Sequence, residues 1–387
     1  MSSGPVKAFE GVRGSAAVLV ALFHLYDLKL VPTGSYWLTV IRNGYIFVDL
    51  FFVLSGYVIF SAYHNRIRNP ADIESFVLRR FGRLFLLLIF ATVVYVLLDN
   101  LLIASHRAFL AAGLPPLLLS PPLAFDIPGF FEILGTVTLT HGLGLFDRLI
   151  LNYASWSIST EFHVYLLFLV VVVTIPAKVR TLVVAMLCTT ALAANCWLSI
   201  YVRHCLEKFG CGGATYDFGF IRCIAFFTLG MLVYKLPKPN PRFVAPAQWL
   251  VLLLAGLFFW AAESYPKAMF LDALLFPFLI YAISTDQGFL GKLFGTGFFQ
   301  MLGQRSYSLY LLHPVLLLAL PVLMREVHGI VANAVLLLAY VPVLIVMAGW
   351  TFRHIEDPMR NHFNAIASKR LHRTARLKNV ATDRTGR

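Results

Sequence analysis

Long apolar runs separated by short polar segments recur from one end of the chain to the other. Most of these runs approach 20 residues, the length at which an α-helix crosses the roughly 30 Å hydrocarbon core of a bilayer. Such lengths favour helices over the shorter, alternating strands of a membrane barrel. The pattern therefore predicts an all-α, polytopic membrane protein with about ten transmembrane helices. We expect these helices at 12–30, 43–63, 84–104, 157–176, 179–202, 217–236, 246–263, 268–284, 306–325 and 329–352.

Two further segments fall outside this set of helices. The stretch 129–147 is short and rich in glycine, so we expect one extra re-entrant or interfacial helix there, with an eleventh span as the alternative. Residues 366–387 are polar and basic, which predicts a disordered cytoplasmic tail. The rest of the chain, 1–365, forms a single membrane domain in this prediction.

Composition and charge support the membrane assignment and add an orientation. The chain is 59% hydrophobic and only 13% charged, against about 25% charged residues in soluble domains. If the N-terminus is cytoplasmic, 23 of the 32 lysines and arginines face inward, as the positive-inside rule requires. We therefore expect both termini in the cytoplasm. The net charge of +13 follows from this bias and from a basic tail facing membrane lipids, so no nucleic-acid partner is expected.

Two ionisable residues, His24 and Asp49, lie inside apolar runs, where such side chains are costly and commonly functional. Helix geometry places them at depths that agree within roughly 3 Å. A buried aspartate beside a histidine fixes the tautomer and stabilises the imidazolium, which suits a general base. We therefore expect His24 and Asp49 to be the catalytic pair. The alternative is a structural pair that joins two helices.

Four arginines gather at the inner ends of two predicted helices. Arg13 lies eleven residues before His24, about three helical turns, so both side chains face the same way, roughly 16 Å apart. Arg79, Arg80 and Arg83 lie at the start of the third helix, and guanidinium groups suit phosphate oxygens. We expect the four arginines to form an anion site. The alternative for the last three is an anchor among lipid headgroups.

Polar side chains also collect at the outer start of the fourth helix and along the ninth. We expect Trp156, Ser157 and Glu161 to meet the hydroxyl groups of a substrate that arrives from outside, with a polar interfacial turn as the alternative. Tyr310 and His313 lie on the ninth helix and are expected to support the site. For His313, a packed histidine with a backbone partner is the alternative.

The five cysteines lack the spacing of a metal site, so no metal is expected. Cys205 and Cys211 fall in one predicted outside loop, where an oxidising compartment permits a disulfide. The sequence leaves open whether these two residues are paired or remain free thiols.

The motifs around these residues occur in the order found in the membrane acyltransferase-3 family of bacterial O-acyltransferases, which the chain resembles over almost its whole length. Arg13 and His24 lie in FEGVRGSAAVLVALFH, and Asp49 lies in GYIFVDLFFVLSGYVIF. The other motifs are RRFGRL, WSISTEFHVYLLF, IRCIAFFTLGMLVY, SYSLYLLHPVLL and IEDPMR. His163 departs from the family, since a more amide-like residue is usual there. The resemblance is to the family's short form, so we expect no appended soluble hydrolase-like domain.

The resemblance implies an acyltransferase that moves an acyl group, expected to be acetyl, from cytoplasmic acyl-CoA to a hydroxyl of an extracytoplasmic acceptor. The expected acceptor is a cell-surface glycan or a lipid-linked molecule, and the expected location is the bacterial cytoplasmic (inner) membrane. The four arginines would then bind acyl-CoA. The residues alone also allow a proton-coupled transporter that uses His24 and Asp49 as a relay, or an anion-binding membrane scaffold.

Overall fold

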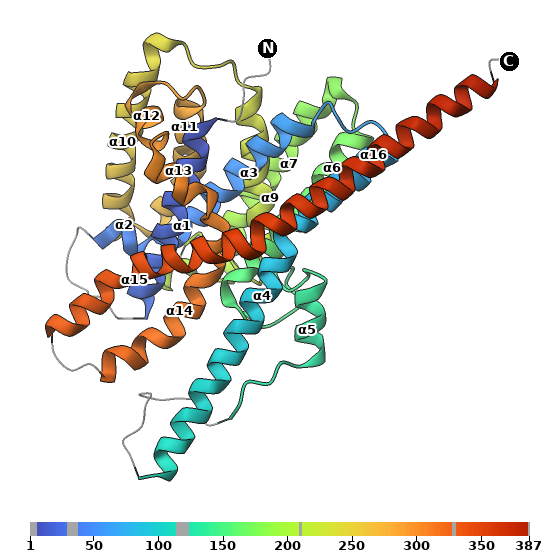
Figure 1. The fold of residues 1–387 in the computed structure, drawn as a ribbon. Coiled ribbons are helices and arrows are strands. Elements are labelled where there is room, and N and C mark those ends of the chain that lie inside the picture. The colour runs from blue at the N-terminus through green and yellow to red at the C-terminus, as the bar shows by residue number, and fades with distance from the viewer. Residues whose placement is uncertain (1–5, 29–37, 114–123, 209–210, 327–329, 386–387) are drawn as a thin grey trace.

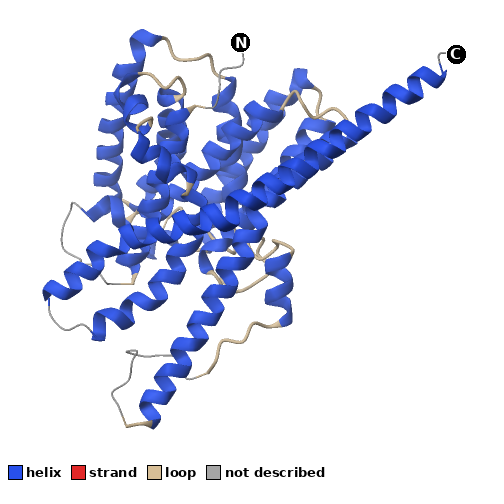
Figure 2. Cartoon of the chain, in the orientation of Figure 1, coloured by secondary structure: helices blue, strands red, loops and turns tan. Residues whose placement is uncertain are grey.

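The computed structural model describes residues 6–28, 38–113, 124–208, 211–326 and 330–385. Within these residues the regular elements are helices (Figure 2). The α-helices in chain order are α1 (Lys7–Asp27), α2 (Thr39–Arg42), α3 (Phe47–Tyr63), α4 (Pro70–Ala111), α5 (Phe130–Val137), α6 (Trp156–Thr174), α7 (Ala177–Trp197), α8 (Cys205–Lys208), α9 (Gly219–Lys235), α10 (Pro241–Ser264), α11 (Asp272–Ile283), α12 (Gly288–Phe294), α13 (Gly297–Gln304), α14 (Ser306–Glu326), α15 (Ile330–Thr351) and α16 (Asp357–Thr385).

The predicted all-α, polytopic membrane fold is confirmed. Nine helical stretches of the described chain are long and apolar enough to cross a bilayer. In addition α9, with 17 residues, lies at the position of the sixth predicted span. The helix found within 129–147 is α5, which has eight residues. Eight residues are too few to cross a bilayer, so this segment is not an eleventh span.

The helices that carry the predicted site form the middle of the bundle. In Figure 1, α1, α3 and α9 run through the centre, with α10 to α13 on one side and α6 and α7 on the other. Glycines bring α3 and α9 into close contact: a Cβ at Gly56 would lie 1.9 Å from the Phe227 carbonyl oxygen, and one at Gly230 would lie 2.0 Å from the Val53 oxygen. Close approach through small residues is a common way for membrane helices to associate.

Helix α4 begins at a well-defined cap and then extends far along the bundle. The Asn69 side chain accepts a hydrogen bond from the Asp72 backbone amide at 3.1 Å, and Asp72 accepts one from the Asn69 amide at 3.1 Å. This reciprocal capping stabilises the first turn, where Pro70 is also favourable. The helix has 42 residues, roughly 63 Å at 1.5 Å per residue. Its clustered arginines, Arg79, Arg80 and Arg83, therefore lie in about the third and fourth turns, toward the end of the helix at which it begins.

Helix α16 continues to Thr385, through most of the segment 366–387 that the sequence analysis expects to be a disordered tail. The segment is rich in residues of good helix propensity, and its first turns rest on α4. Arg79 of α4 donates to Ser368 at 2.8 Å, and Arg370 forms an ion pair with Glu74. Figure 1 shows α16 crossing the bundle and projecting past it.

The close approach of α3 and α9 predicts that replacing Gly56 by valine destabilises the protein. The new side chain would overlap the α9 backbone at Phe227, and overpacking costs about 1–3 kcal/mol. Thermal unfolding in detergent should show a lower Tm. The matched control is Gly256→Ala in α10, where a Cβ meets no atom within 4 Å. Equal Tm values for the two variants would contradict the packing argument.

Candidate functional site: three adjoining cavities

Three cavities follow one another through the bundle and contain most of the predicted site residues. The arginine cavity, lined by the four predicted arginines, has a volume of about 300 Å³. The narrow cavity, lined by Ser157 and Glu161, has about 60 Å³. The histidine cavity, lined by His24, has about 540 Å³. Their linings overlap: Arg13, Arg83, Ser306 and Tyr307 border the first two, and Val48 and Tyr310 border the last two.

The arginine cavity confirms that the four predicted arginines come together. Five arginines and two glutamates line it, so its charge favours an anion. Arg13 is paired with Glu10 at 3.0 Å. Arg79 is instead held by neutral groups, donating to Asn364 at 3.2 Å and to Ser368 at 2.8 Å. Its positive charge is therefore not matched by these contacts.

Arg80 is oriented by aromatic rings. Its guanidinium lies 5.7 Å from the centre of the Tyr63 ring and 5.9 Å from that of Phe76, distances at which cation–π attraction operates. Its Nε is buried and has no hydrogen-bond partner in the described part of the chain. A buried donor without a partner is costly, and a bound acceptor group would satisfy it. Arg80 thus points to a ligand in this cavity.

His24 borders the histidine cavity from the last turn of α1. Its Nδ1 lies 2.9 Å from the Val20 carbonyl oxygen. Because a carbonyl can only accept, Nδ1 carries the hydrogen in the neutral ring, and Nε2 keeps its lone pair. The ring lies 4.8 Å from that of His313 and 5.1 Å from that of Tyr153. Asp27, on the same cavity, interacts electrostatically with His24.

The predicted hydrogen-bonded pair of His24 and Asp49 is wrong. Asp49 accepts two hydrogen bonds from Arg222 of α9, at 2.6 and 2.8 Å, and the two side chains are 0% and 1% exposed. The prediction rested on equal depth in the membrane, which says nothing about the direction in which a side chain points. Asp49 points to α9, whereas His24 lies against α14. The tautomer of His24 is set by a backbone carbonyl instead.

Arg222 was missed by the sequence analysis, although the same signal could have found it. It lies within the apolar run of α9, as His24 and Asp49 do within theirs. Its guanidinium also donates to the Ala214 carbonyl at 2.9 Å and to the Tyr45 carbonyl at 3.2 Å. Asp272, buried at the start of α11, lies beside Asp49. Arg222 is therefore the centre of a buried polar network.

The start of α6 lies deeper than predicted. Trp156 borders the histidine cavity, but Ser157 and Glu161 line the narrow cavity. Ser157 donates to the Tyr310 hydroxyl at 2.8 Å. Glu161 accepts hydrogen bonds from Ser55, at 2.6 Å, and from Tyr165. These polar groups therefore close the passage between the two larger cavities rather than forming an outer mouth.

The physical reason is that the chain before α6 folds over its first turn. The Gly142 backbone amide donates to Ser159 at 2.9 Å, and Ser159 donates to the Leu139 carbonyl. His141 is buried beside Ser155, its Nε2 lying 2.9 Å from the Ser155 hydroxyl. Burial lowers the pKa of His141, so the ring is neutral at pH 7. This cover excludes the first turn of α6 from the surface.

Tyr310 and His313 both lie on α14, close to the place where the narrow cavity meets the histidine cavity, but only Tyr310 lines these cavities. Tyr310 borders both cavities. His313 is fully buried beside His24, and its ring lies 5.7 Å from that of Tyr310. Neither ring nitrogen of His313 forms a well-aligned hydrogen bond in the described chain, although the carbonyls of Leu309 and Tyr310 lie nearby. His313 thus packs against His24, the predicted base.

The question left open for the cysteines is answered by the structure. Cys205 and Cys211 form a disulfide. The other three cysteines, Cys188, Cys196 and Cys223, are free thiols.

The buried pair predicts a specific pattern of stability. Arg222→Met leaves the Asp49 carboxylate without its cation, and breaking a buried ion pair in this way costs about 3–5 kcal/mol. The double variant Asp49→Leu/Arg222→Met removes both charges and should be destabilised less. Thermal unfolding in detergent compares the two. If the single and double variants unfold at the same temperature, the pair does not carry the stability that we assign to it.

Sequence comparisons relate the chain to a family of known proteins. The family model described as "Acyltransferase domain" matches residues 6–353. The peptidoglycan O-acetyltransferase OatA of Listeria monocytogenes is 25% identical over 94% of this chain and 58% of its own length. A Bacillus subtilis protein named "Putative peptidoglycan O-acetyltransferase YrhL" is 26% identical over 97% of this chain and 58% of its own length. No solved structure gives a significant match.

A third relative is similar over more of its own length. The protein named "Putative membrane-bound transacylase BcsY", from Komagataeibacter xylinus, is 27% identical over 87% of this chain and 79% of its own length. The chain therefore spans less than two thirds of the first two relatives and most of the third. Since the family model covers nearly the whole chain, from before Arg13 to the end of α15, this protein belongs to the membrane acyltransferase family.

Proposed function

We propose that this protein is an O-acyltransferase that moves an acyl group, expected to be acetyl, from cytoplasmic acyl-CoA to a hydroxyl of an extracytoplasmic glycan. The observation that carries the proposal is the row of three adjoining cavities from the four arginines to His24. Two relatives named as peptidoglycan O-acetyltransferases support acetyl as the group and a cell-wall glycan as the acceptor.

The arginine cavity suits the phosphates of coenzyme A. Its charge is positive. In the part of the chain that the structure describes, Arg79 has no carboxylate among its hydrogen-bond partners, and Arg80 keeps a donor free for a ligand. Planar guanidinium groups bind phosphate oxygens with two hydrogen bonds at once. Coenzyme A would remain in this cavity, and its narrower pantetheine arm would pass Ser157 and Glu161 toward His24. The narrow cavity would have to open for this arm, because it holds only about 60 Å³.

His24 is proposed as the general base. With Nδ1 bound to the Val20 carbonyl, Nε2 is free to take the proton of an acceptor hydroxyl. The hydroxyl oxygen would then attack the thioester carbonyl carbon, the carbon–sulfur bond would break, and the imidazolium would return its proton to the thiolate. A route in which His24 first carries the acyl group is equally consistent with this geometry. In both routes Asp49 acts through Arg222 and not on the reacting atoms.

The proposed orientation places the arginine cavity at the cytoplasmic side and the histidine cavity toward the outside, with both termini in the cytoplasm. The inward bias of lysine and arginine supports it. The disulfide supports it independently, because Cys211 lies beside Tyr45, which borders the histidine cavity, and disulfides persist in oxidising compartments. In bacteria this corresponds to the cytoplasmic membrane.

The test of the proposed function is the variant His24→Ala. Loss of general-base catalysis should lower acyl transfer by about 10²–10⁴-fold, while the affinity for acetyl-CoA stays within about twofold. Transfer is measured as radioactive acetate, released by mild alkali from a cell-envelope glycan fraction after incubation with labelled acetyl-CoA.

The matched control for this variant is His163→Ala. His163 is also half-buried in a helix, and its Nδ1 lies 3.0 Å from the Ser159 carbonyl oxygen. Full transfer by His24→Ala would overturn the proposed role of His24. No transfer by the wild-type protein to any envelope fraction would overturn the proposed function itself.

The arginine cavity predicts a separate effect on donor binding. Arg79→Gln should weaken the binding of coenzyme A by about tenfold to a hundredfold, since hydrogen bonds to charged groups contribute about 1.5–3 kcal/mol. Calorimetric titration of coenzyme A into the detergent-solubilised protein measures this. The control is Arg148→Gln, whose guanidinium is paired with Glu132 in the segment before α6. If Arg79→Gln, Arg80→Gln and Arg83→Gln all bind coenzyme A with unchanged affinity, acyl-CoA binds elsewhere.

A further inference from the structure

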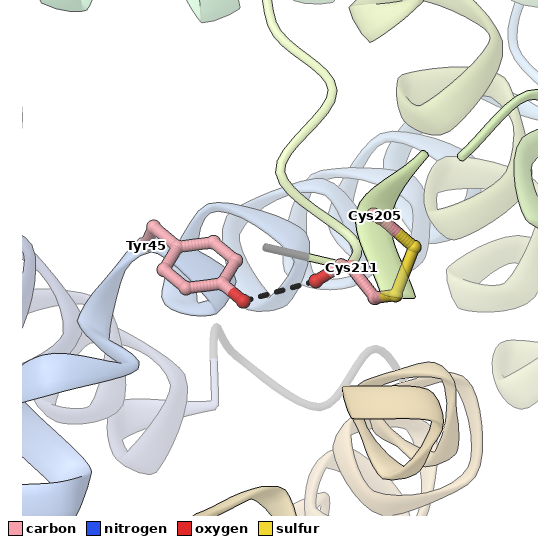
Figure 3. Close-up of a disulfide and its surroundings, with 3 residues drawn as sticks. All are labelled: Tyr45, Cys205 and Cys211. Carbon is pink, nitrogen blue, oxygen red and sulfur yellow. Dashed lines mark hydrogen bonds between the residues drawn. A yellow bond between two sulfur atoms is a disulfide. The ribbon is translucent and has the colours of Figure 1, made fainter. Parts of the chain in front are cut away.

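One wall of the histidine cavity is a short loop that a disulfide closes. We call the described residues of 203–217 the disulfide loop. Its Arg203, Gly213 and Thr215 border the cavity that contains His24. Within it, the bond between Cys205 and Cys211 joins residues six apart, and both cysteines are buried (Figure 3). The disulfide is therefore a buried link within the loop that borders the cavity, although the two cysteines themselves do not line it.

The disulfide loop is held against the bundle by two side chains from the floor of the cavity. The Tyr45 hydroxyl donates to the Cys211 carbonyl oxygen at 2.9 Å (Figure 3). Arg222 donates to the Ala214 carbonyl at 2.9 Å and to the Tyr45 carbonyl at 3.2 Å. Because Arg222 is fixed by Asp49, the buried ion pair also fixes the loop. Cys211 therefore has two restraints: the disulfide to Cys205 and the hydrogen bond from Tyr45.

The far end of the loop is also attached. The Gly144 backbone amide donates to the Tyr216 carbonyl at 2.8 Å. Gly144 has a φ of +79°, and a Cβ there would lie 2.9 Å from the Asp217 carbonyl oxygen, so glycine is needed at this contact. Arg203 and Asp217 form an ion pair that joins the two ends of the loop. With its ends attached in this way, the middle of the loop depends on the disulfide, Tyr45 and Arg222.

We propose that the Cys205–Cys211 disulfide positions the acceptor: it holds the disulfide loop as a wall of the histidine cavity, so recognition of the acceptor depends on it and binding of acyl-CoA does not. This inference rests on the proposed function. Its physical basis is the separation of the two binding regions. The arginine cavity is lined from α1, α4, α13, α14, α16 and the turn before α16, whereas the disulfide loop borders the histidine cavity.

Removing the disulfide gives the loop more conformational freedom. A short loop without its crosslink opens locally at a low free-energy cost, while the packed helices remain folded. The Tyr45 hydrogen bond to Cys211 would then form only part of the time, and the wall would be incomplete when the acceptor arrives. The acceptor would bind more weakly, with the reacting groups themselves unchanged. The expected signature is a higher KM for the acceptor at an unchanged Kd for acetyl-CoA.

The experiment uses the full chain in detergent with labelled acetyl-CoA as donor. The acceptor probe is a cell-envelope glycan fraction from which O-acyl esters have been removed by mild alkali. Initial rates at increasing glycan concentration give the acceptor KM, and titration gives the Kd for acetyl-CoA. The variant Cys205→Ser/Cys211→Ser should raise the acceptor KM at least fivefold and leave the Kd within twofold. The control Cys196→Ser changes a free, half-buried cysteine of α7 and should leave both values unchanged.

Tyr45→Phe provides a second variant that keeps the disulfide and removes only the hydroxyl that reaches Cys211. It should raise the acceptor KM in the same direction by a smaller factor, and it carries the test alone if the double serine variant does not fold. An unchanged acceptor KM in the variants that fold would overturn the proposal. An equal loss of acetyl-CoA affinity would also overturn it, because the disulfide would then support the whole fold. These comparisons require a wild-type protein that transfers acetyl. If the wild-type protein transfers none, that result contradicts the proposed function and not the role of the disulfide.

Discussion

A carboxylate and a guanidinium that are removed from water must satisfy one another, and Asp49 and Arg222 do so through hydrogen bonds of 2.6 and 2.8 Å between the first turns of α3 and α9. Taking two charges out of water is expensive, and only good geometry with further hydrogen bonds compensates for it. Here the remaining donors of Arg222 reach the carbonyls of Ala214 and Tyr45. The pair thus links two core helices to the loop that borders the histidine cavity. The close contact of α3 and α9 at Gly56 and Gly230 brings the two charges within reach of one another.

The two ends of α1 meet different chemical environments. Near its start, Arg13 borders a cavity lined by cationic side chains, and near its end His24 borders a larger cavity with tyrosine and tryptophan side chains. Arg13 and His24 are eleven residues apart, so the helix separates these environments by roughly 16 Å, about half the thickness of the hydrocarbon core. The polar contacts of Glu161 and Ser157 lie between them. A single helix therefore sets the distance between the cavity proposed to bind acyl-CoA and the cavity proposed to bind the acceptor.

The sequence predicted the class of fold and the convergence of the arginines because both depend on periodicity. Long apolar runs indicate spans, and residues four apart on α4 share a face whatever the helix packs against. The partner of Asp49 could not be predicted in the same way. Depth follows from counting residues, but the direction of a side chain depends on how each helix is rotated against its neighbours. The burial of Ser159 likewise depends on the chain at 139–142, which folds over α6 through contacts between residues 17 and 20 apart.

The narrow cavity also matters for the membrane as an electrical barrier. Water-filled spaces that entered the protein from both sides would shorten the insulating layer to the thickness of the region between them, here the hydrogen-bonded groups around Glu161, Tyr165 and Tyr310. Moving one elementary charge across a membrane potential of 100 mV releases about 2.3 kcal/mol, so protons would flow through any continuous column of water. If these side chains close around the thin, uncharged pantetheine arm, the acyl group would cross the membrane while the ion gradient persists.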